Sequence, residues 1–298
     1  MATQPLPADA PEHSEDVVQQ NRPKKARMST RQRFLFFFTA WLLVLMPFLF
    51  WWGTWFGRPL SAKDMTEYIN DNNHPRHIQH ALVQLGQRMT QHDGSASQWY
   101  NDLLRLASNP REEVRSTDAW VMGQDTAFLP FHEALLKMLD DPSLVVRGNA
   151  ALSLVRFGDA SGRPVIVSLL QPVTINATTP GKVVDVSTAG TAIHENGLVA
   201  KVKTPDGRTQ ELRSPISGRL SAISVATGAN LSPGAKVATV APEDGQVWEA
   251  LRALYLIGQS DDLPAIRSYE RSLPEISERV RVQAINTERV IQERAGKQ

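Results

Sequence analysis

Apolar and polar patterns divide this chain into segments of different character. Residues 34–56 read FLFFFTAWLLVLMPFLFWWGTWF and carry no charge at any of 23 positions. Because a helix rises ~1.5 Å per residue, such a run is long enough to cross a hydrocarbon core of ~30 Å. The pattern predicts a transmembrane helix over residues 34–56, bent at Pro47.

The residues that flank this apolar run predict its orientation. Basic side chains gather just before it, including Arg31 and Arg33, and three tryptophans gather near its other end: Trp51, Trp52 and Trp55. Basic residues favour the cytoplasmic side, and indole rings favour the interface between membrane and water. We therefore expect these five residues at the membrane interfaces of a bacterial inner membrane, the N-terminus in the cytoplasm and the later domains in the periplasm. No clean small-x-small pattern follows the run, which favours an uncleaved signal anchor.

Apolar residues at helical spacing predict helices over much of the remaining chain. A motif of the form Asn/Asp-Pro-x3-Val-Arg-x3-Ala begins at Asn109 and recurs from Asp141, at an offset of 32 residues. Each unit predicts a helix, a short turn and a second helix. Since one helix pair cannot cover its own apolar stripe, about four such units are expected to stack.

Particular side chains occupy fixed places in these units. Arg115 and Arg147 share one position, where we expect each to pair with an acid or a carbonyl of the neighbouring repeat. Asp141 precedes Pro142 and is expected to cap a helix that begins with the proline. Trp120 lies at helical spacing among apolar residues and is predicted to belong to the core.

Residues 141–159, DPSLVVRGNAALSLVRFGD, resemble the unit of the short HEAT-like repeat family, which often reads Asp-Pro-x3-Val-Arg-x3-Ala-x2-Ala-Leu-Gly-x-Leu-Gly-Asp. The resemblance implies an α-solenoid, a fold whose concave face binds other proteins. Some HEAT-like proteins are lyases that handle bilin chromophores. The same resemblance therefore leaves an enzymatic function open.

Residues 173–243 interrupt the helical pattern. They are rich in Val, Thr, Gly and Pro, and their short alternating runs between turn signals predict strands. Glycines recur in this segment at offsets of 37 or 38 residues. Gly181 is matched by Gly218, Gly190 by Gly228, and Gly197 by Gly234. Beyond the interruption the helical repeat resumes, with residues 154–158 matched by residues 254–258 at an offset of 100. The ends of the insert should lie close together so that the next helix can continue the array.

The second half of the insert, residues 214–240, resembles the biotinyl/lipoyl-like barrel-sandwich hybrid. In that family a lysine at the hairpin between the two halves carries the cofactor. The corresponding segment here reads KTPDGR over residues 203–208 and has no lysine at its apex. Lys201 and Lys203, in or beside the preceding strand, are the nearest candidates for lipoylation or biotinylation, and we expect no cofactor. Membrane-fusion adaptors of efflux and secretion systems are similar in joining an anchor to such a domain, but a long helical hairpin divides its halves.

Three histidines form the most metal-like cluster of the sequence. His77 and His80 would share one helix face, and His74 precedes them near the expected helix start. A zinc site needs further ligands, so we expect surface histidines that bind no metal. The formal net charge of +1 and the lack of an extended basic patch beyond residues 22–33 argue against a nucleic-acid partner. The sequence has no Cys, and we find no nucleophile elbow and no phosphate-binding glycine loop.

Together these patterns predict an α+β multidomain protein with a single transmembrane helix, a HEAT-like α-solenoid and an inserted all-β barrel-sandwich hybrid. The expected order is a disordered cytoplasmic tail with a basic juxtamembrane segment (1–33), the transmembrane helix (34–56), HEAT-like repeats (57–172), the lipoyl-like insert (173–243) and further HEAT-like repeats (244–298).

The function predicted from this organisation is that of a non-catalytic scaffold or accessory subunit. Residues 34–56 would anchor it in the lipid bilayer, and its outer domains would bind an integral membrane protein complex. We expect it not to be an enzyme. The alternatives are a reduced periplasmic adaptor of an efflux or secretion system, a HEAT-like lyase, and a lipoyl-type carrier.

Overall fold

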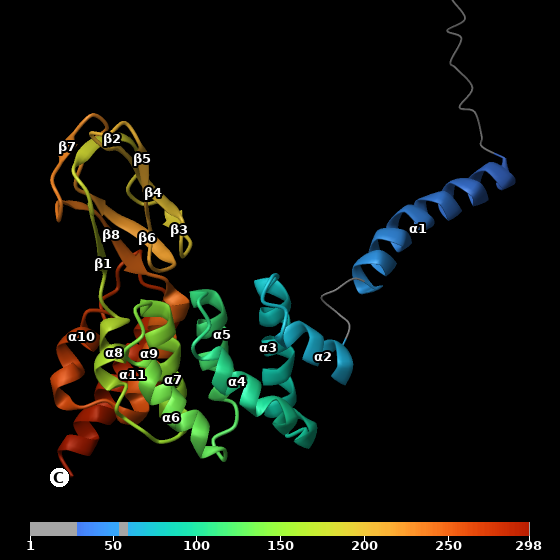
Figure 1. The fold of residues 1–298 in the computed structure, drawn as a ribbon, viewed down its shortest axis with the longest axis horizontal. Coiled ribbons are helices and arrows are strands. Elements are labelled where there is room, and N and C mark those ends of the chain that lie inside the picture. Colours follow the sequence, from blue (N-terminus) through green and yellow to red (C-terminus); the bar gives the residue numbers. More distant parts are fainter. Residues whose placement is uncertain (1–28, 54–58, 298) are drawn as a thin grey trace, which may run out of the picture. The chain divides into compact units, whose positions relative to one another are not determined.

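The computed structural model describes residues 29–53 and 59–297, and of residues 49–53 it describes the backbone alone. The chain forms two compact units, Met1–Arg58 and Pro59–Gln298. The second unit is largely helical, with one β segment between its helices (Figure 1). All of the candidate functional residues discussed below belong to this second unit.

The first unit contains one described helix, α1 (Thr30–Gly53). None of the helices in the described part of the chain combines the length and the apolarity that a membrane crossing requires. The prediction of a transmembrane helix over residues 34–56 is therefore wrong. Helix α1 begins earlier than predicted, so it includes the charged Arg31 and Arg33, which lower the mean hydropathy of its described part.

The bilayer as a partner and the location in a bacterial inner membrane fall with the membrane helix. The membrane-interface roles expected of five residues are not tested by the described structure and stay predictions: Arg31, Arg33, Trp51, Trp52 and Trp55. Arg31 and Arg33 lie exposed in the first turn of α1. Trp55 and residues 1–28 lie outside the described residues, and so do the side chains of Trp51 and Trp52.

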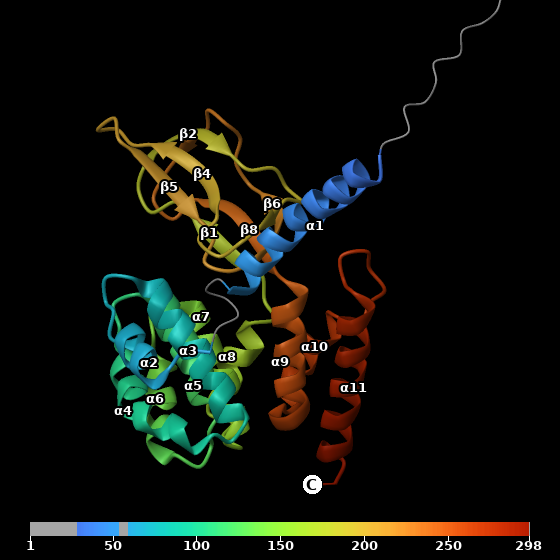
Figure 2. The same cartoon turned by 90° about the vertical axis from the view of Figure 1, so that its right-hand side faces the viewer.

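The helices of the second unit form two layers (Figures 1 and 2). In chain order they are α2 (Ala62–Ile69), α3 (Pro75–Thr90), the 3₁₀ helix η1 (Gly94–Trp99), α4 (Tyr100–Leu106), α5 (Glu112–Met122), α6 (Leu129–Met138), α7 (Leu144–Arg156), α8 (Arg163–Ser168), α9 (Asp244–Ile257), the 3₁₀ helix η2 (Ser260–Asp262), α10 (Leu263–Arg267) and α11 (Glu278–Ala295). Helices α3, α5, α7, α9 and α11 each pack against the next and form one layer. The shorter α4, α6, α8 and α10 pack against that layer and form the other.

The 32-residue sequence repeat corresponds to this stacking. Helices α5 and α7 pack side by side, and the repeat aligns Val114 with Val146 and Ala119 with Ala151. All four side chains are fully buried. The helical part is thus an array of stacked helix pairs, as the repeat predicts, because each pair covers the apolar stripe of its neighbour.

A bidentate ion pair joins the two clearest repeats. Arg115 on α5 donates from Nε to Oδ2 of Asp141 at 2.7 Å and from Nη2 to Oδ1 at 2.9 Å. Its Nη1 donates to the carbonyl of Asn109 at 2.7 Å. The two charged side chains are only 12% and 8% exposed. The prediction that Arg115 pairs with an acid of the neighbouring repeat is confirmed.

Two other expectations for this turn are corrected. Asp141 does not cap the helix, because α7 begins at Leu144 and the side chain of Ser143 caps it. Arg147 does not reach the next repeat but donates from Nη1 to the carbonyl of Asp141 at 2.6 Å. The Asp-Pro turn is therefore held by arginines from both repeats, one on its carboxylate and one on its backbone.

The insert consists of eight described strands: β1 (Val173–Asn176), β2 (Gly181–Val186), β3 (Ala192–Ile193), β4 (Leu198–Lys203), β5 (Thr209–Arg213), β6 (Gly218–Ile223), β7 (Asn230–Leu231) and β8 (Lys236–Pro242). They form two antiparallel sheets with the orders β1-β8-β6-β3 and β5-β4-β2-β7. Side chains of both sheets share one buried cluster, which includes Val183, Val202, Leu220 and Val240. The insert therefore has an apolar core of its own.

The repeated glycines mark a structural repeat within the insert. An offset of 37 or 38 residues places β2 on β6, β3 on β7 and β4 on β8. The order β1-β8-β6-β3 becomes the order β5-β4-β2-β7 when each strand is replaced by its counterpart, with β5 as the counterpart of β1. The two sheets are therefore related by the repeat. The closed barrel of a barrel-sandwich hybrid is contradicted, however. The outer strands β3 and β7 have only two residues each, and the described strands form two separate sheets.

The ends of the insert lie side by side, as predicted. Val173 in the first strand pairs with Val240 in the last. Two hydrogen bonds then join the turn after α8 to the chain beyond the insert. Gln246 Nε2 on α9 donates to the carbonyl of Leu169 at 3.0 Å, and Tyr269 Oη, just after α10, donates to that of Leu170 at 2.6 Å. The helical array therefore continues across the insert.

We predict that the Arg115–Asp141 pair is a major source of stability. Replacing either residue with alanine leaves the other charge buried and unpaired, which should lower the free energy of unfolding by about 2–4 kcal/mol. Urea denaturation of the two single variants and the double variant measures this. Arg281→Ala is the control, because its exposed pair with Glu278 should contribute less than about 1 kcal/mol. Equal effects of Arg115→Ala and Arg281→Ala would contradict the prediction.

A buried carboxyl group gives a second prediction, with the opposite pH dependence to an ordinary ion pair. Asp118 on α5 is fully buried, and neither carboxyl oxygen has a hydrogen-bond partner among the described residues. Burial raises the pKa of Asp118 well above its usual value, although the charge of Arg105 opposes this. Because the folded state holds the proton more tightly, the stability contributed by this proton is complete below the unfolded pKa of ~3.9 and is lost as the pH rises toward the folded pKa.

Asp118→Asn should remove this dependence. Relative to the variant, the wild-type chain should lose up to about 1.4 kcal/mol of unfolding free energy per pH unit above pH ~4, until the folded pKa is reached. Thermal or urea unfolding of both proteins between pH 4 and 8 measures the difference. Parallel stability curves for the two proteins would refute a raised pKa at this position.

Candidate functional site

A groove of about 960 Å³ crosses the layer formed by α5, α7, α9 and α11, and we call it the helical groove. Its lining from α7 includes Asn149, Leu152, Ser153 and Arg156. Its lining from α9 includes the residues 100 positions later: Glu249, Arg252, Ala253 and Leu256. The groove therefore lies on the same face of successive repeats. The sequence contains this correspondence as the offset of 100 residues between the two repeats. From that offset we predicted the repeat but not the groove.

Small side chains bring the helices of the groove close together. A Cβ atom on Gly123, at the end of α5, would lie 2.5 Å from Oγ of Ser153 on α7. Ser153 in turn donates to the carbonyl of Ala119 at 2.8 Å. Farther along the array, Thr287 on α11 donates to the carbonyl of Leu251 at 3.0 Å. Hydroxyl groups thus tie neighbouring helices together beneath the groove.

Large apolar side chains are exposed in the helical groove. Trp120 is 41% exposed, Tyr255 is 38% exposed and Leu256 is still more open. The prediction that Trp120 belongs to the core is therefore wrong. Its ring lies against Gly86 on α3, where a Cβ atom would come within 2.8 Å of Cζ3 of the indole. The ring is supported on that side and exposed on the other.

Positive charge exceeds negative charge in the helical groove, which contains three arginines and one glutamate. Glu249 pairs with Arg252 at 3.5 Å, and the Arg252 guanidinium also lies 4.7 Å from the ring centre of Trp248. Arg156 and Arg289 are exposed and have no acidic partner within the described part of the chain. These two side chains are free to bind an anion.

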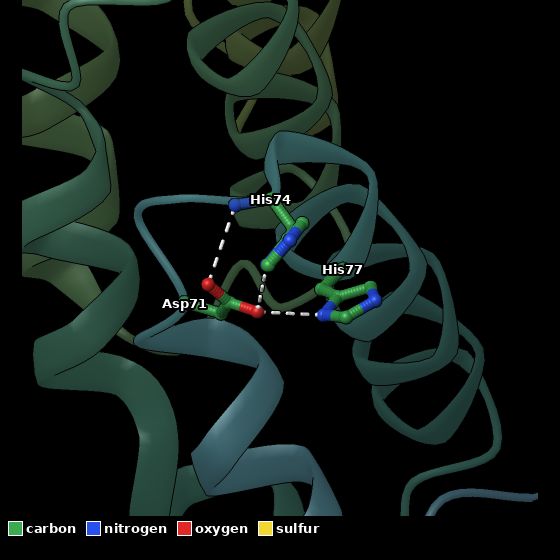
Figure 3. Close-up of side chains that lie close together, drawn as sticks. All are labelled: Asp71, His74 and His77. Atoms are coloured by element: carbon green, nitrogen blue, oxygen red, sulfur yellow. Dashed lines mark hydrogen bonds and ion pairs between the residues drawn. The ribbon is translucent and has the colours of Figure 1, made fainter.

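A second candidate lies in the turn between α2 and α3, where Asp71, His74 and His77 meet (Figure 3). Oδ2 of Asp71 lies 2.8 Å from Nδ1 of His74 and 2.7 Å from Nδ1 of His77. Oδ1 accepts the amides of Asn73 and His74, both at 3.2 Å. The ring of Tyr68 stacks on His77 with the centres 4.4 Å apart. We call these three residues the Asp-His-His cluster.

The structure brings together two of the three histidines that the sequence singled out. His80 lies apart from the ligand atoms of the Asp-His-His cluster, and its Nε2 lies 2.7 Å from Nε2 of Gln84. Burial and then the charge of His77 lower the pKa of His80. For Asp71, burial opposes the change, but the interactions with both imidazoles lower the pKa of its carboxyl group. Sequence spacing did not identify Asp71, because a turn and not a helix brings it to the histidines.

The two lysines considered for lipoylation or biotinylation lie in β4. Lys201 is paired with Asp185 on one side and Glu211 on the other, and both of these neighbours are acidic. Lys203 is the last residue of the strand, opposite Lys182 and Thr209. The hairpin that follows, residues 204–208, is closed by a hydrogen bond from the amide of residue 204 to the carbonyl of residue 208 and carries no lysine. It also leaves no place for the helical hairpin of an adaptor.

No protein-family model matches this sequence, and no curated protein matches it either. Solved structures show limited similarity, and two of them illustrate its extent. The complex of CpcE and CpcF of phycocyanin lyase from Nostoc sp. PCC7120 is 17% identical, with a TM-score of 0.42 over 80% of this chain and 68% of that chain. A single-chain, multi-domain long-chain acyl-CoA carboxylase is 14% identical, with a TM-score of 0.23 over 33% of this chain and 10% of that chain. At these scores neither similarity carries an argument about substrate or partner.

Parts of the functional prediction are not retained. One of these two similar structures is a lyase complex, and the prediction that this protein is not an enzyme is withdrawn. The predictions of an integral membrane complex as its partner and of a membrane-anchored scaffold or adaptor are withdrawn as well, since no described helix can cross a membrane. An array of stacked helix pairs remains.

We predict that Gly123 controls the spacing of the helices beneath the helical groove. Gly123→Ala should lower the free energy of unfolding by about 1–3 kcal/mol, because the new methyl group would overlap Ser153. Gly94→Ala is the matched control, since nothing lies within 4 Å of a Cβ atom there. Urea denaturation of the two variants measures the difference in unfolding free energy. If Gly123→Ala is as stable as Gly94→Ala, the prediction that Gly123 controls the helix spacing is wrong.

Proposed function

We propose that the helical groove binds an anionic ligand with an extended apolar body, and that this binding serves a lyase-like function. The observation that carries the proposal is one arrangement of four side chains. Trp120 and Tyr255 expose aromatic surface in the same groove in which Arg156 and Arg289 have no acidic partner among the described residues.

The charged residues support an anion as part of the ligand. A guanidinium group matches a carboxylate through two parallel hydrogen bonds, and such charge-assisted bonds are stronger than neutral ones. Since Arg252 already lies beside Glu249, the excess charge is concentrated on Arg156 and Arg289. These two residues come from α7 and α11, so a ligand that reaches both would cross the intervening α9.

The size and apolar lining support an organic ligand. A groove of about 960 Å³ lies near the upper end of the range of roughly 300–1,000 Å³ that small-molecule sites occupy. Aromatic side chains contribute large contact areas to such sites. Trp120 is also held against Gly86, so its ring needs little reorganisation to receive a flat ligand.

A bilin has both features, because it is an open-chain, conjugated tetrapyrrole with carboxylate side chains. This ligand class agrees with the resemblance of residues 141–159 to HEAT-like repeats, some of which occur in bilin lyases. The chain contains no cysteine, so a thioether bond to this protein is excluded. Any bilin would be held without a covalent thioether and could be passed to an acceptor protein.

The open shape of the groove favours a second candidate function, the binding of an acidic segment of a partner protein. Four amide side chains line the groove and could bond a peptide backbone: Gln124, Asn149, Gln283 and Asn286. The same arginines would then receive Asp or Glu side chains. This function agrees with the use of concave solenoid surfaces for protein binding.

We predict that the protein binds biliverdin with a change in the absorption spectrum of the pigment, and that the affinity depends on the groove. Arg156→Gln and Arg289→Gln should each weaken binding about tenfold, as expected for one charge-assisted hydrogen bond. Trp120→Ala should weaken it at least as much. Arg271→Gln is the charge-matched control, because Arg271 is exposed and does not line the groove.

Titration followed by absorbance, at low and high salt, distinguishes the two functions. Binding of biliverdin that is lost in the groove variants supports the lyase-like function. No spectral change with biliverdin, combined with groove-dependent binding of a glutamate-rich peptide by fluorescence anisotropy, would favour the second function. Binding of neither ligand would refute the assignment of the groove as an anion site.

A further inference from the structure

The Asp-His-His cluster offers three metal-binding atoms at one point, far along the chain from the helical groove. Oδ2 of Asp71 and Nδ1 of His74 and His77 all lie within 4.8 Å of one another. Two imidazole nitrogens and one carboxylate oxygen are a donor set that zinc accepts, with water in the fourth position. The site is therefore chemically complete in its protein ligands.

The cluster is held in place by contacts that involve no metal. Oδ1 of Asp71 accepts two backbone amides, which leaves Oδ2 directed at the imidazoles. His74 occupies the N-cap position of α3, and His77 lies in the first turn of that helix, on the ring of Tyr68. A site whose ligands are already oriented loses less entropy when an ion binds.

The distances in the cluster suit hydrogen bonds and need only a small change to suit an ion. With metal–ligand distances of ~2.0–2.1 Å, the ligand atoms of a tetrahedral zinc site lie roughly 3.3 Å apart. The two nitrogen–oxygen distances are 2.7 and 2.8 Å. The carboxylate oxygen must therefore move outward by roughly half an ångström. The side chain of His74 is 65% exposed, so water can reach the site.

We propose that Asp71, His74 and His77 bind one Zn²⁺ ion, through Oδ2 and the two Nδ1 atoms, with water as the fourth ligand. A neutral imidazole that carries its hydrogen on Nδ1 gives that proton to solvent and takes one on Nε2, so no net proton is released. Harder ions such as Mg²⁺ prefer oxygen ligands and are excluded by the two nitrogens.

The ion would join the first helix pair of the array. Asp71 lies beyond the end of α2, whereas both histidines belong to the start of α3. Helix α2 is short and packs on α3, with Met65 and Ile69 buried between them and their neighbours. Coordination would therefore tie a short terminal helix to the array, whose end repeats have a neighbour on one side only.

Isothermal titration of the metal-stripped full chain with ZnCl₂ tests the proposal. We expect one ion per chain, and Co²⁺ in place of Zn²⁺ should give the visible absorption bands of a tetrahedral site. His77→Ala and Asp71→Asn should weaken binding at least tenfold. His74→Gln should do the same without harm to folding, because His74 is largely exposed.

Two control variants separate this site from other histidines. His132→Ala removes a histidine that also lies 2.7 Å from an aspartate, Asp159, and His80→Gln removes the neighbour that is not in the cluster. Both should keep stoichiometric binding. A wild-type chain that takes up no Zn²⁺ would overturn the proposal, as would binding that is unchanged in His74→Gln and Asp71→Asn. The groove variants should not affect Zn²⁺ binding, so this test is independent of the proposed function.

Discussion

The ion pair between Arg115 and Asp141 fixes how one helical repeat lies on the next. A helix pair has an apolar stripe that it cannot cover alone, so stacking is obligatory, but apolar contact by itself leaves the register free. The pair sets that register because both hydrogen bonds of the guanidinium fork must reach one carboxylate. Burial of the pair makes this constraint strong, since either charge alone would be costly.

The same requirement explains how the array accommodates a β insert. A solenoid can be interrupted only where the next helix still finds its place on the last one. Val173 and Val240 pair at the base of the insert, so the chain leaves and returns at one point. Arg163 on α8 then donates to Asp262 at 2.8 Å, across the insert, and thereby links helices that are distant in the sequence. The insert supplies its own core and leaves the stacking intact.

The helical groove and the Asp-His-His cluster follow from different parts of this architecture. The groove is collective, because one face of four successive helices supplies its lining, and close packing at Gly123 and Ser153 supports it. The cluster is local, because one turn brings Asp71 to two histidines of the next helix. A stable array can carry both, since neither site requires the core to open.

The sequence by itself determined the features that depend on local periodicity. These are the stacked helix pairs, the pairing of Arg115 with an acid, the β insert with two similar halves, and a hairpin without a lysine. Tertiary structure alone decided which surfaces are covered. Trp120 has the spacing of a core residue but is half exposed, and Asp71 replaces His80 beside His74 and His77. The apolar run over residues 34–56 also predicted a membrane helix, but none of the described helices is long and apolar enough to cross a membrane. A periodic pattern shows which side of an element is apolar, but the neighbour that packs against that side is set by contacts distant in the chain.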